Sequence, residues 1–335
     1  MSKGASLNSA RHFCTLFDRN YIDRGLALHR SLLRHCADFT LHILCLDAPT
    51  ERALAALALP RTQLMNLQTL LDTDADLAAC RGRKPAEFYF TCKPVLLRYL
   101  LDRCQGLSRL DYLDADLYFF SDPSSAETEY AGTPVALSPH RFDAPNAGRV
   151  RYGRFNAGWV SIDGSPQARR FVEWWRERCI EWCSLNVEDT RFGDQKYLDQ
   201  VPSLFAPDAV VPHPGVNLAP WNIGGCRIEA TAGGVQVDGR PLVFFHFHGT
   251  KRMLFNVYEC GLYDYGVSLT PAIRRGIYGP YVRELDASRR QLRKLPRAMR
   301  DDLAPRMKPG ARGFARHLIS TARAVARHST VFAAT

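Results

Sequence analysis

Short apolar runs alternate with segments of helical periodicity along most of the chain. The apolar runs have the composition of β-strands, and the segments between them repeat apolar residues at the spacing of amphipathic helices. The expected strands are 11–18, 39–47, 111–123, 133–139, 155–163 and 242–247, and the expected helices are 19–36, 50–59 with Thr50 as N-cap, 91–104 and 165–183. Strands and helices in this alternation form parallel sheets, because each helix returns the chain to the same edge. We therefore predict an α/β fold with a mixed, mostly parallel sheet, helices on both faces, and ligands at the carboxyl ends of the strands.

Size and charge divide the chain into two parts. Its 335 residues are 46% hydrophobic, which is enough for one large core. The segment from Arg283 to Ser329 has 13 lysines and arginines against 4 acidic residues, so that most of the net charge of +10 lies there. We predict a main domain over residues 10–265 and a basic helical C-terminal tail over residues 266–335.

The cysteines and the apolar stretches indicate the compartment. Ten cysteines are scattered without any CxxC pair. We expect reduced thiols in a cytoplasmic protein. No stretch approaches 18 consecutive apolar residues, and residues 1–17 have no apolar segment of the kind found in secretion signals. The expectation is therefore neither secretion nor a membrane-spanning helix.

Two aspartates, Asp114 and Asp116, stand one residue apart in the otherwise apolar run DYLDADLYFFSDP. Side chains of a strand alternate between its faces, so both carboxylates would share a face at the carboxyl end. Two carboxylates this close repel each other, and one would take up a proton unless a cation binds. Oxygen ligands suit Mg²⁺ or Mn²⁺, which also bind diphosphate oxygens. We predict a metal and diphosphate site here.

Other interpretations of this pair differ in what they require. A calcium loop needs acidic or asparagine residues at alternating positions and a glycine, but Tyr118 and Phe120 stand there. A phosphohydrolase of the haloacid dehalogenase type usually has a small hydroxyl residue, not a tyrosine, at the position of Tyr118. Both patterns fail at this tyrosine. A solvated turn remains open as the structural alternative.

Five segments, in order along the chain, resemble the nucleotide-sugar glycosyltransferases of the A-type fold, most closely the retaining family 8 group and its bacterial relatives. The segments are TLFDRNYIDRGLALHRSLLRH (15–35), KPVLLRYLL with YLDADLYF (93–101 and 112–119), FNAGWVSI (155–162), FGDQKYL (192–198) and HFHGTKR (246–252). The resemblance implies a single Rossmann-like nucleotide-diphospho-sugar transferase domain, which would make residues 10–265 the catalytic domain. It also implies metal-dependent transfer from a nucleotide sugar, most simply a UDP-sugar, with retention of the anomeric configuration.

The resemblance also implies a role for individual residues. Residues implied at the donor nucleotide and sugar are Thr15, Asp18, Asn20, Tyr21, Lys93, Asp114, Ala115, Ala157, Gly158, Gly249, Lys251 and Arg252. The implied ligands of Mn²⁺ or Mg²⁺ are Asp114, Asp116 and His246, and the implied catalytic residues are Asn156, Asp194 and Gln195. Gln195 would stabilise the developing oxocarbenium ion, and Asp194 would bind sugar hydroxyls.

Several of these assignments have alternatives. His246 and His248 would share one face of a strand, and the spacing to Gly249 in the family favours His246 as the ligand. The family usually has a lysine six residues after this histidine, where Arg252 stands here, so either Lys251 or Arg252 could contact phosphate. Asp194 could instead cap a short helix. The residues Asn217, Trp221 and Asn222 suit either the lip of the site or loop packing.

The basic tail predicts an amphipathic helix over 310–329. Its apolar residues would be Phe314, Leu318, Ile319, Ala322 and Val325, and its basic residues Arg312, Arg316, Arg323 and Arg327. Such a helix favours reversible binding to an anionic membrane surface near lipid-linked acceptors, or else packs on its own domain. Nucleic acid is not an expected partner, because the tail has few aromatic residues and no nucleic-acid motif.

The leading hypothesis is therefore a glycosyltransferase that acts on a glycan, lipid-linked or other glycoconjugate acceptor, in the cytoplasm or at the inner face of the membrane. The alternative is a non-catalytic module that binds a nucleotide sugar or polysaccharide and is tethered by its basic tail. The complete set of Asp114, Asp116 and His246 speaks against this alternative.

Overall fold

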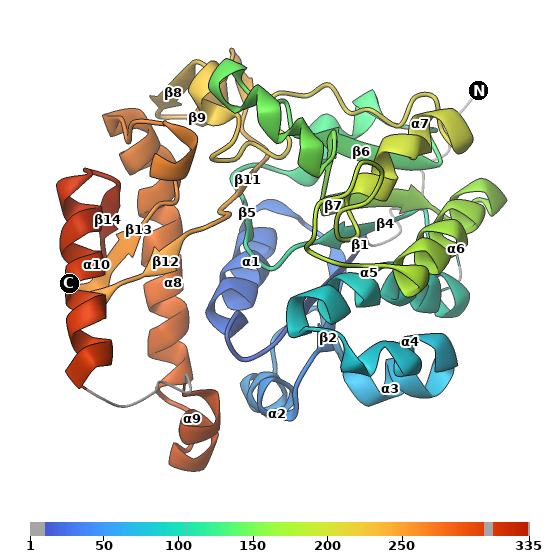
Figure 1. Cartoon of the computed structure of the whole chain (residues 1–335), viewed down its shortest axis with the longest axis horizontal. Helices are drawn as coiled ribbons and strands as arrows, with labels where there is room; N and C mark the ends of the chain where they lie inside the picture. Colours follow the sequence, from blue (N-terminus) through green and yellow to red (C-terminus); the bar gives the residue numbers. More distant parts are fainter. Residues whose placement is uncertain (1–10, 105, 305–310, 334–335) are drawn as a thin grey trace, which may run out of the picture.

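The computed structural model describes residues 11–104, 106–304 and 311–333. Its central sheet has six strands in the order β3-β2-β1-β4-β7-β6 (Figure 1). These strands are β1 (Arg11–Phe17), β2 (Phe39–Cys45), β3 (Thr62–Asn66), β4 (Arg109–Leu113), β6 (Val135–Pro139) and β7 (Phe155–Asp163). Strand β7 runs in the opposite direction to the other five strands of this sheet, so the sheet is mixed and mostly parallel. The predicted fold class is confirmed.

The order of the sheet reverses at β1. Strands β2 and β3 extend it on one side of β1, and β4, β7 and β6 extend it on the other. At such a reversal the loops that follow the two diverging parallel strands turn to opposite faces, which opens a crevice at their carboxyl ends. Here that crevice lies after β1 and β4, where Asp18 and Asp114 begin the two connections.

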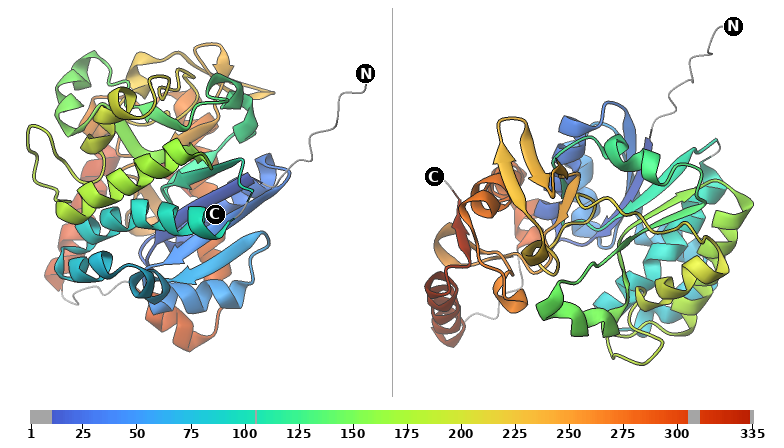
Figure 2. Two further views of the ribbon diagram at one scale, coloured as in Figure 1. Left: turned by 90° about the vertical axis from the view of Figure 1, so that its right-hand side faces the viewer. Right: turned by 90° about the horizontal axis from the view of Figure 1, so that it is seen from above.

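Helices cover both faces of this sheet (Figures 1 and 2). On one face Phe13 and Phe17 pack with α1 and α2, and on the other Cys14 and Leu16 pack with α5 and α6. The helices concerned are α1 (Ile22–His35), α2 (Ala48–Leu57), α5 (Pro85–Arg103) and α6 (Pro166–Glu181), with the short α3 (Leu67–Thr73), α4 (Ala75–Ala79) and α7 (Val201–Leu204) beside them.

The predicted N-cap at Thr50 is wrong. Helix α2 begins at Ala48, and the carboxylate of Asp47 accepts a hydrogen bond from the backbone N–H of Thr50 at 2.9 Å. Aspartate is a strong N-cap, and the first helical turn tolerates Pro49, which has no N–H to donate. The helix therefore starts earlier than its apolar periodicity suggested.

The prediction of a single strand over 111–123 is wrong. Strand β4 ends at Leu113, and a tight turn closed by the hydrogen bond from Leu117 N to Asp114 O, at 3.1 Å, leads into β5 (Leu117–Phe119). Strand β5 leaves the central sheet and pairs antiparallel with β11 (Phe244–His246). Asp114 and Asp116 therefore lie in a turn between two sheets rather than on one face of a strand.

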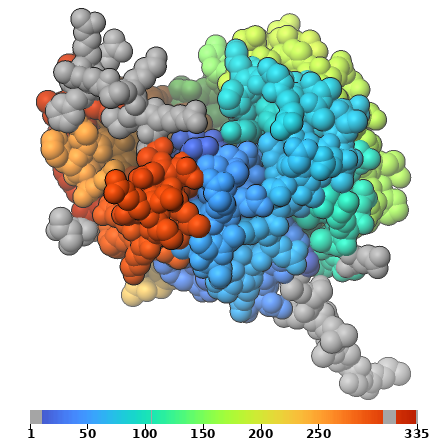
Figure 3. Space-filling model, turned by 90° about the horizontal axis from the view of Figure 1, so that it is seen from below, coloured from blue at the N-terminus to red at the C-terminus, as the bar shows by residue number. Residues whose placement is uncertain are grey.

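The C-terminal segments pack against the N-terminal helices. Helix α8 (Gly279–Leu292) contacts α1, and α9 (Arg297–Leu303) contacts α2, as the adjoining orange and blue surfaces in Figure 3 show. Glu284 of α8 forms ion pairs with Arg30 and Arg34 of α1. A shared hydrophobic cluster also joins Tyr281 to Tyr118. The predicted boundary at residue 265 stays a prediction, although one core includes side chains from both sides of it.

Smaller elements complete the fold. They include the strands β8 (Ile228–Thr231), β9 (Gly234–Val237) and β10 (Arg240–Pro241), and a second small sheet of β12 (Lys251–Arg252), β13 (Val257–Glu259) and β14 (Thr330–Phe332). Beside this second sheet lie the π-helical turn Ile273–Tyr278 and α10 (Ala311–Ala326). None of the helices in the described part of the chain is both long and apolar enough to cross a bilayer.

Candidate active site

A cleft of about 660 Å³ opens at the carboxyl ends of β1 and β4. It brings together most of the residues that the sequence analysis selected: Asp18, Asn20, Tyr21, Lys93, Asp114, Ala115, Asp116, Asn156, Ala157, Gly158, Asp194, Gln195 and His246 all line it. Thr15 is buried within β1 and does not line the cleft. Gly249, Lys251 and Arg252 also lie outside the lining, and the last two are exposed in β12. The assignment of these four residues to the donor therefore remains a prediction.

Asp114, Asp116 and His246 converge at the centre of the cleft. Their candidate ligand atoms all lie within 4.8 Å of one another. His246 Nε2 is 3.2 Å from a carboxylate oxygen of Asp116 and 4.0 Å from one of Asp114. Burial alone would raise the pKa of Asp116, but the neighbouring histidines and Arg24 hold it well below its usual value. His248 is not among the residues whose candidate ligand atoms meet here, and its ring centroid lies 6.1 Å from that of His246.

The orientation of His246 tests whether the cluster fits a cation. Its Nδ1 lies 3.2 Å from the side-chain oxygen of Asn156, and that oxygen can only accept, so Nδ1 carries the proton. Nε2 then directs its lone pair toward the two carboxylates. A lone pair facing anionic oxygens is unfavourable unless the ring is protonated or a cation lies between them. Two carboxylates and one imidazole suit Mn²⁺, and the anchored Nδ1–H is the arrangement usual for histidine ligands.

Asn156 also connects this cluster to Gln195. Its amide nitrogen donates to Gln195 Oε1 at 3.1 Å, and Gln195 Nε2 donates to the backbone oxygen of Tyr152 at 2.9 Å. The oxygen of Asn156 accepts further hydrogen bonds from Gly158 N at 3.0 Å and from Asn217 at 3.3 Å. The amide groups of Asn156 and Gln195 are therefore both fixed in one orientation.

Lys93 lies buried between two carboxylates. Its Nζ is 3.1 Å from Asp114 and 3.1 Å from Asp194. Burial alone would lower the pKa of Lys93, but these two aspartates raise it above its usual value. Burial raises the pKa of Asp194, and Lys93 opposes that rise. The residue at the N-cap position of the short 3₁₀ turn Lys196–Gln200 is Gln195, so Asp194 does not occupy the capping position that the alternative assigned to it.

Gly158 allows the histidine to reach this position. A Cβ atom at Gly158 would lie 2.6 Å from His246 Cε1 and 2.7 Å from the Asn156 oxygen. Both distances are shorter than van der Waals contact, and the neighbouring atoms belong to the two side chains just described. The glycine of the FNAGWVSI segment is therefore explained by close packing beneath the candidate metal site.

The candidate nucleotide end of the cleft lies beside β1. Asp18 accepts hydrogen bonds from the backbone and side chain of Asn20 and from the hydroxyl of Tyr89, at 2.9, 3.0 and 3.2 Å. Tyr21 is 44% exposed, and the guanidinium of Arg24 lies 4.4 Å from its ring centroid. A half-exposed aromatic ring at this place offers a surface on which a base can stack.

Comparison with known proteins places the chain in a family. No family model matches it. It is 32% identical over 284 residues to the uncharacterized protein YfnD of Bacillus subtilis (strain 168), an alignment that covers 83% of this chain and 89% of YfnD. The chain belongs to the YfnD family. A second member from the same organism, the uncharacterized protein YfnF, is 31% identical over 252 residues, which cover 73% of this chain and 83% of YfnF.

The fold of this YfnD-family chain is that of a solved sugar-transfer enzyme. It superposes on the galactosyltransferase LgtC, solved in complex with donor and acceptor sugar analogues, with a TM-score of 0.53 over 87% of this chain and 99% of that one. Sequence identity is only 14%, so the likeness establishes the fold, which is the A-type glycosyltransferase fold. Membership of the retaining family 8 group remains a proposal.

Aromatic residues that sequence reasoning had not selected form another wall of the cleft in this YfnD-family chain. They are Tyr89, Phe90, Phe142, Tyr152, Phe192 and Tyr265, and they stand beside His140 and Arg149. Most lie in loops or 3₁₀ turns without a periodic pattern, so nothing but their residue types could have indicated them. Trp221, left open between a lip and loop packing, lines the cleft, whereas Asn222 bonds the backbone of its own loop and of His140.

Proposed function

We propose that this YfnD-family protein is a metal-dependent glycosyltransferase that transfers a sugar from a nucleotide sugar, most simply a UDP-sugar, with retention. The observation that carries the proposal is the meeting of Asp114, Asp116 and His246 with the fixed amide of Gln195 in one cleft of an A-type fold. These residues come from three parts of the chain: Asp114 and Asp116 from the turn after β4, His246 from β11, and Gln195 from the loop before the 3₁₀ turn Lys196–Gln200.

Asp114, Asp116 and His246 would hold Mn²⁺ or Mg²⁺, which supplies positive charge to the diphosphate of the donor. Lys93 holds Asp114 in place from the buried side, at 3.1 Å. Asp18, Asn20 and Tyr21 would bind the nucleoside at the end of β1. The donor sugar would then lie over Ala157 and Gly158 of β7 and beside Gln195.

The proposal of retention is supported by the groups that are available to react. Asp194 is paired with Lys93 and buried, so it is poorly placed to act as a nucleophile or base. Gln195 presents an amide oxygen, which stabilises positive charge on the sugar ring but is a weak nucleophile. The acceptor hydroxyl would attack the face from which the diphosphate leaves. A new C–O bond forms, the bond to the diphosphate breaks, and the departing diphosphate takes up the hydroxyl proton.

The aromatic wall supports a glycan or other sugar-containing acceptor. Aromatic rings stack on the apolar faces of pyranose rings, and Tyr152 and Phe192 lie in contact there with centroids 5.0 Å apart. The indole N–H of Trp221 is buried and has no hydrogen-bond partner among the described residues. A sugar hydroxyl or a donor oxygen would satisfy it.

The direct test is a screen of nucleotide sugars for hydrolysis and transfer, with and without Mn²⁺, using the wild type and Asp116→Asn. We expect metal-dependent turnover of one or a few UDP-sugars, lost in the variant. Metal-independent turnover, or full activity of Asp116→Asn, would refute the proposal. Tight binding of a nucleotide sugar without any turnover would favour the alternative, a non-catalytic binding module.

We further propose that α10 docks on the inner, anionic face of a membrane, which would bring lipid-linked acceptors to the cleft. Leu318, Ile319 and Val325 are 44%, 52% and 40% exposed, Arg323 is exposed on the same helix, and Arg327 is exposed directly after its end. Phe314, Arg312 and Arg316 belong to the predicted face, but their side chains lie outside the described residues. An exposed apolar stripe beside arginines suits a surface of anionic lipid.

Vesicle co-sedimentation tests this docking. We expect binding to vesicles that contain phosphatidylserine, little binding to pure phosphatidylcholine, and loss of binding in Leu318→Glu with Ile319→Glu. Leu204→Glu is the matched control, because Leu204 is 53% exposed but lies in α7. Equal binding by the wild type and the double variant would exclude α10 as the docking element.

A further inference from the structure

Two histidines and a cysteine meet at the end of the central sheet away from the cleft. His12 lies near the start of β1, His42 lies in β2, and Cys104 follows the last residue of α5. Their candidate ligand atoms, two imidazole nitrogens and one sulfur, all lie within 4.8 Å of one another. His42 is buried, and the other two are partly exposed. None of the three lines the cleft.

The sheet and α5 create this cluster. In the parallel pairing of β1 and β2, His12 faces Thr40 and Cys14 faces His42, so the two histidines are diagonal neighbours on one face. It is the face on which α5 packs, because Cys14 and Leu16 share a hydrophobic cluster with Leu96 and Leu97 of α5. Helix α5 ends at the cluster, where Cys104 N donates to Leu100 O at 2.8 Å.

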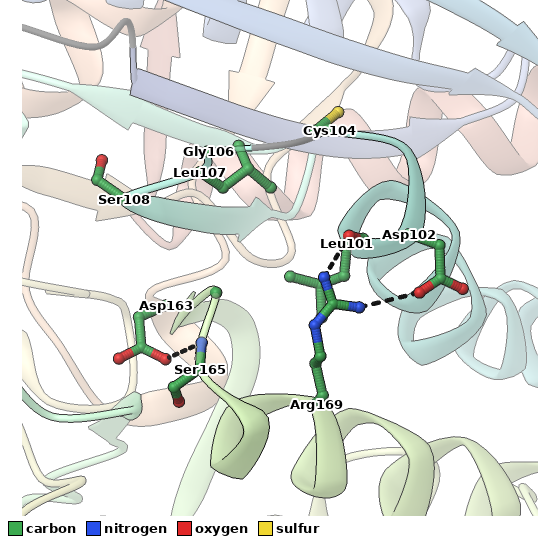
Figure 4. Close-up of a pocket in the computed structure, with 10 residues that line it drawn as sticks. Leu101, Asp102, Cys104, Gly106, Leu107, Ser108, Asp163, Ser165 and Arg169 are labelled. Carbon is green, nitrogen blue, oxygen red and sulfur yellow. Dashed lines mark hydrogen bonds and ion pairs between the residues drawn. The ribbon is translucent and has the colours of Figure 1, made fainter.

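The cysteine points toward the histidines rather than into the neighbouring cavity. That cavity, about 570 Å³, is bordered by Asp163, Arg169 and Cys104 among others. Figure 4 shows Cys104 at its edge, with the sulfur directed away from Asp163 and Arg169. Arg169 is itself engaged by Asp102 at 2.9 Å and by Leu101 O at 2.6 Å, as the dashed lines in Figure 4 show.

The distance between the two histidine nitrogens is close to that of a tetrahedral metal site. His12 Nδ1 and His42 Nε2 are 3.1 Å apart. Zinc bonds to imidazole nitrogen of about 2.0–2.1 Å give a tetrahedral N···N edge of about 3.3–3.4 Å. The two rings are nearly parallel, with centroids 5.4 Å apart, and direct these nitrogens toward each other, so both rings would have to turn for an ion to bind. The same contact also suits an N–H···N hydrogen bond between two neutral rings, which is the competing explanation.

We propose that His12, His42 and Cys104 bind Zn²⁺ and fasten the end of α5 to the first two strands. Two imidazoles and a thiolate are a softer donor set than the two carboxylates and imidazole of the cleft, so the two sites differ in the metal they prefer. Binding releases the thiol proton of Cys104 to solvent and leaves a zinc–thiolate bond. Because His12 and Cys104 are partly exposed, water can occupy the fourth position.

Cobalt substitution tests the proposal through a signal that the cleft cannot give. Full-length protein, stripped of metal with a chelator, is titrated with Co²⁺ in the absence of nucleotide sugar. A thiolate ligand produces a charge-transfer band in the near ultraviolet, and none of the three candidate ligands in the cleft has a thiol. We expect this band in the wild type and its loss in Cys104→Ser. Cys226→Ser is the control and should keep the band, because Cys226 is a partly exposed free cysteine outside the cluster.

A second measurement covers the case in which Cys104→Ser folds poorly. At a Zn²⁺ concentration one hundred times the dissociation constant, ion binding should raise the melting temperature of the wild type by about 4 °C. The rise is no larger because a chain of this length has a large unfolding entropy. Asp116→Asn should keep this shift, and His42→Gln should lose it. Absence of the cobalt band from the wild type, or its survival in both Cys104→Ser and His42→Gln, would overturn the site and leave a histidine–histidine hydrogen bond.

Discussion

Replacing Lys93 by methionine removes the ammonium group that lies 3.1 Å from both Asp114 and Asp194. The side chains of Lys93 and Asp194 are each 4% exposed, whereas that of Asp114 is 26% exposed. Methionine fills nearly the same space, so the change tests charge more than packing. Asp194 is left without its cation in a buried position.

The expected cost is large. Breaking a buried ion pair by removal of one partner costs about 3–5 kcal/mol. An unfolding entropy of about 2.1 cal/mol/K per residue gives a chain of this length about 0.7 kcal/mol/K, so the melting temperature should fall by about 4–7 °C. Mn²⁺ affinity should fall as well, because the side chain of Asp114 loses a neighbour that holds it in place.

The cost should depend on pH. Burial raises the pKa of Asp194, and Lys93 opposes the rise, so its removal lets that pKa rise further. A carboxyl group whose pKa is higher in the folded than in the unfolded state favours folding at low pH, and this contribution is lost as the pH rises through the folded pKa. The difference in melting temperature between wild type and variant should therefore be smallest near pH 4 and grow toward pH 8.

Differential scanning calorimetry at several pH values, with Mn²⁺ titration of the same samples, measures both effects. Arg176→Met is the matched control, because Arg176 is also buried and pairs with Asp74 at 2.6 Å, and neither residue lines the cleft. It should lose comparable stability and keep its Mn²⁺ affinity. The reasoning would be refuted if Lys93→Met lowered the melting temperature by less than about 1 °C at pH 8, or if the difference in melting temperature from the wild type became smaller as the pH rises.

Other substitutions separate the roles of neighbouring residues. Gly158→Ala should weaken Mn²⁺ binding at least tenfold, because the added Cβ would lie 2.6 Å from His246. Gly82→Ala is the control and should leave Mn²⁺ binding unchanged, because a Cβ there meets nothing within 4 Å. Titration calorimetry measures the affinity of both variants. His246→Gln should weaken Mn²⁺ binding by about 10–100-fold and His248→Gln by less than about twofold, and equal effects would contradict the ligand assignment. Trp221→Phe keeps an aromatic ring but removes the unpartnered N–H, so the KM for either the donor or the acceptor should rise about 2–10-fold in steady-state assays. If the KM for both substrates stays unchanged, this N–H contacts neither of them.

Much of this arrangement could be predicted from local patterns. The alternation of strands and helices, and the rule that ligands bind at the carboxyl ends of parallel strands, indicated where Asp18 and Asp114 would lie. Apolar periodicity also placed β7 at its observed residues, Phe155–Asp163. These features depend on neighbours in sequence, which the sequence displays directly.

Other features depend on contacts between distant segments and were missed or wrong. The turn at Asp114 follows from the pairing of β5 with β11, more than 120 residues later, so alternation within the run 111–123 was no guide to it. The cluster of His12, His42 and Cys104 has no sequence spacing of a metal motif, because three elements bring it together. The packing of α8 on α1 depends on a charge match between Glu284 and Arg30 that no local pattern reveals.

The amide of Asn156 has different partners on its two sides. Its oxygen accepts from His246 and Gly158, and its nitrogen donates to Gln195. Aspartate at this position would still accept the hydrogen bonds from His246 and Gly158 but could not donate one to Gln195. Only an amide of this size both accepts and donates in this way. Changes at His246 and Gln195 should therefore be non-additive in a double-mutant cycle. If the proposed function holds, a substitution at Gln195 that alters the sugar preference should also change the affinity of the candidate metal site, because Asn156 links the two.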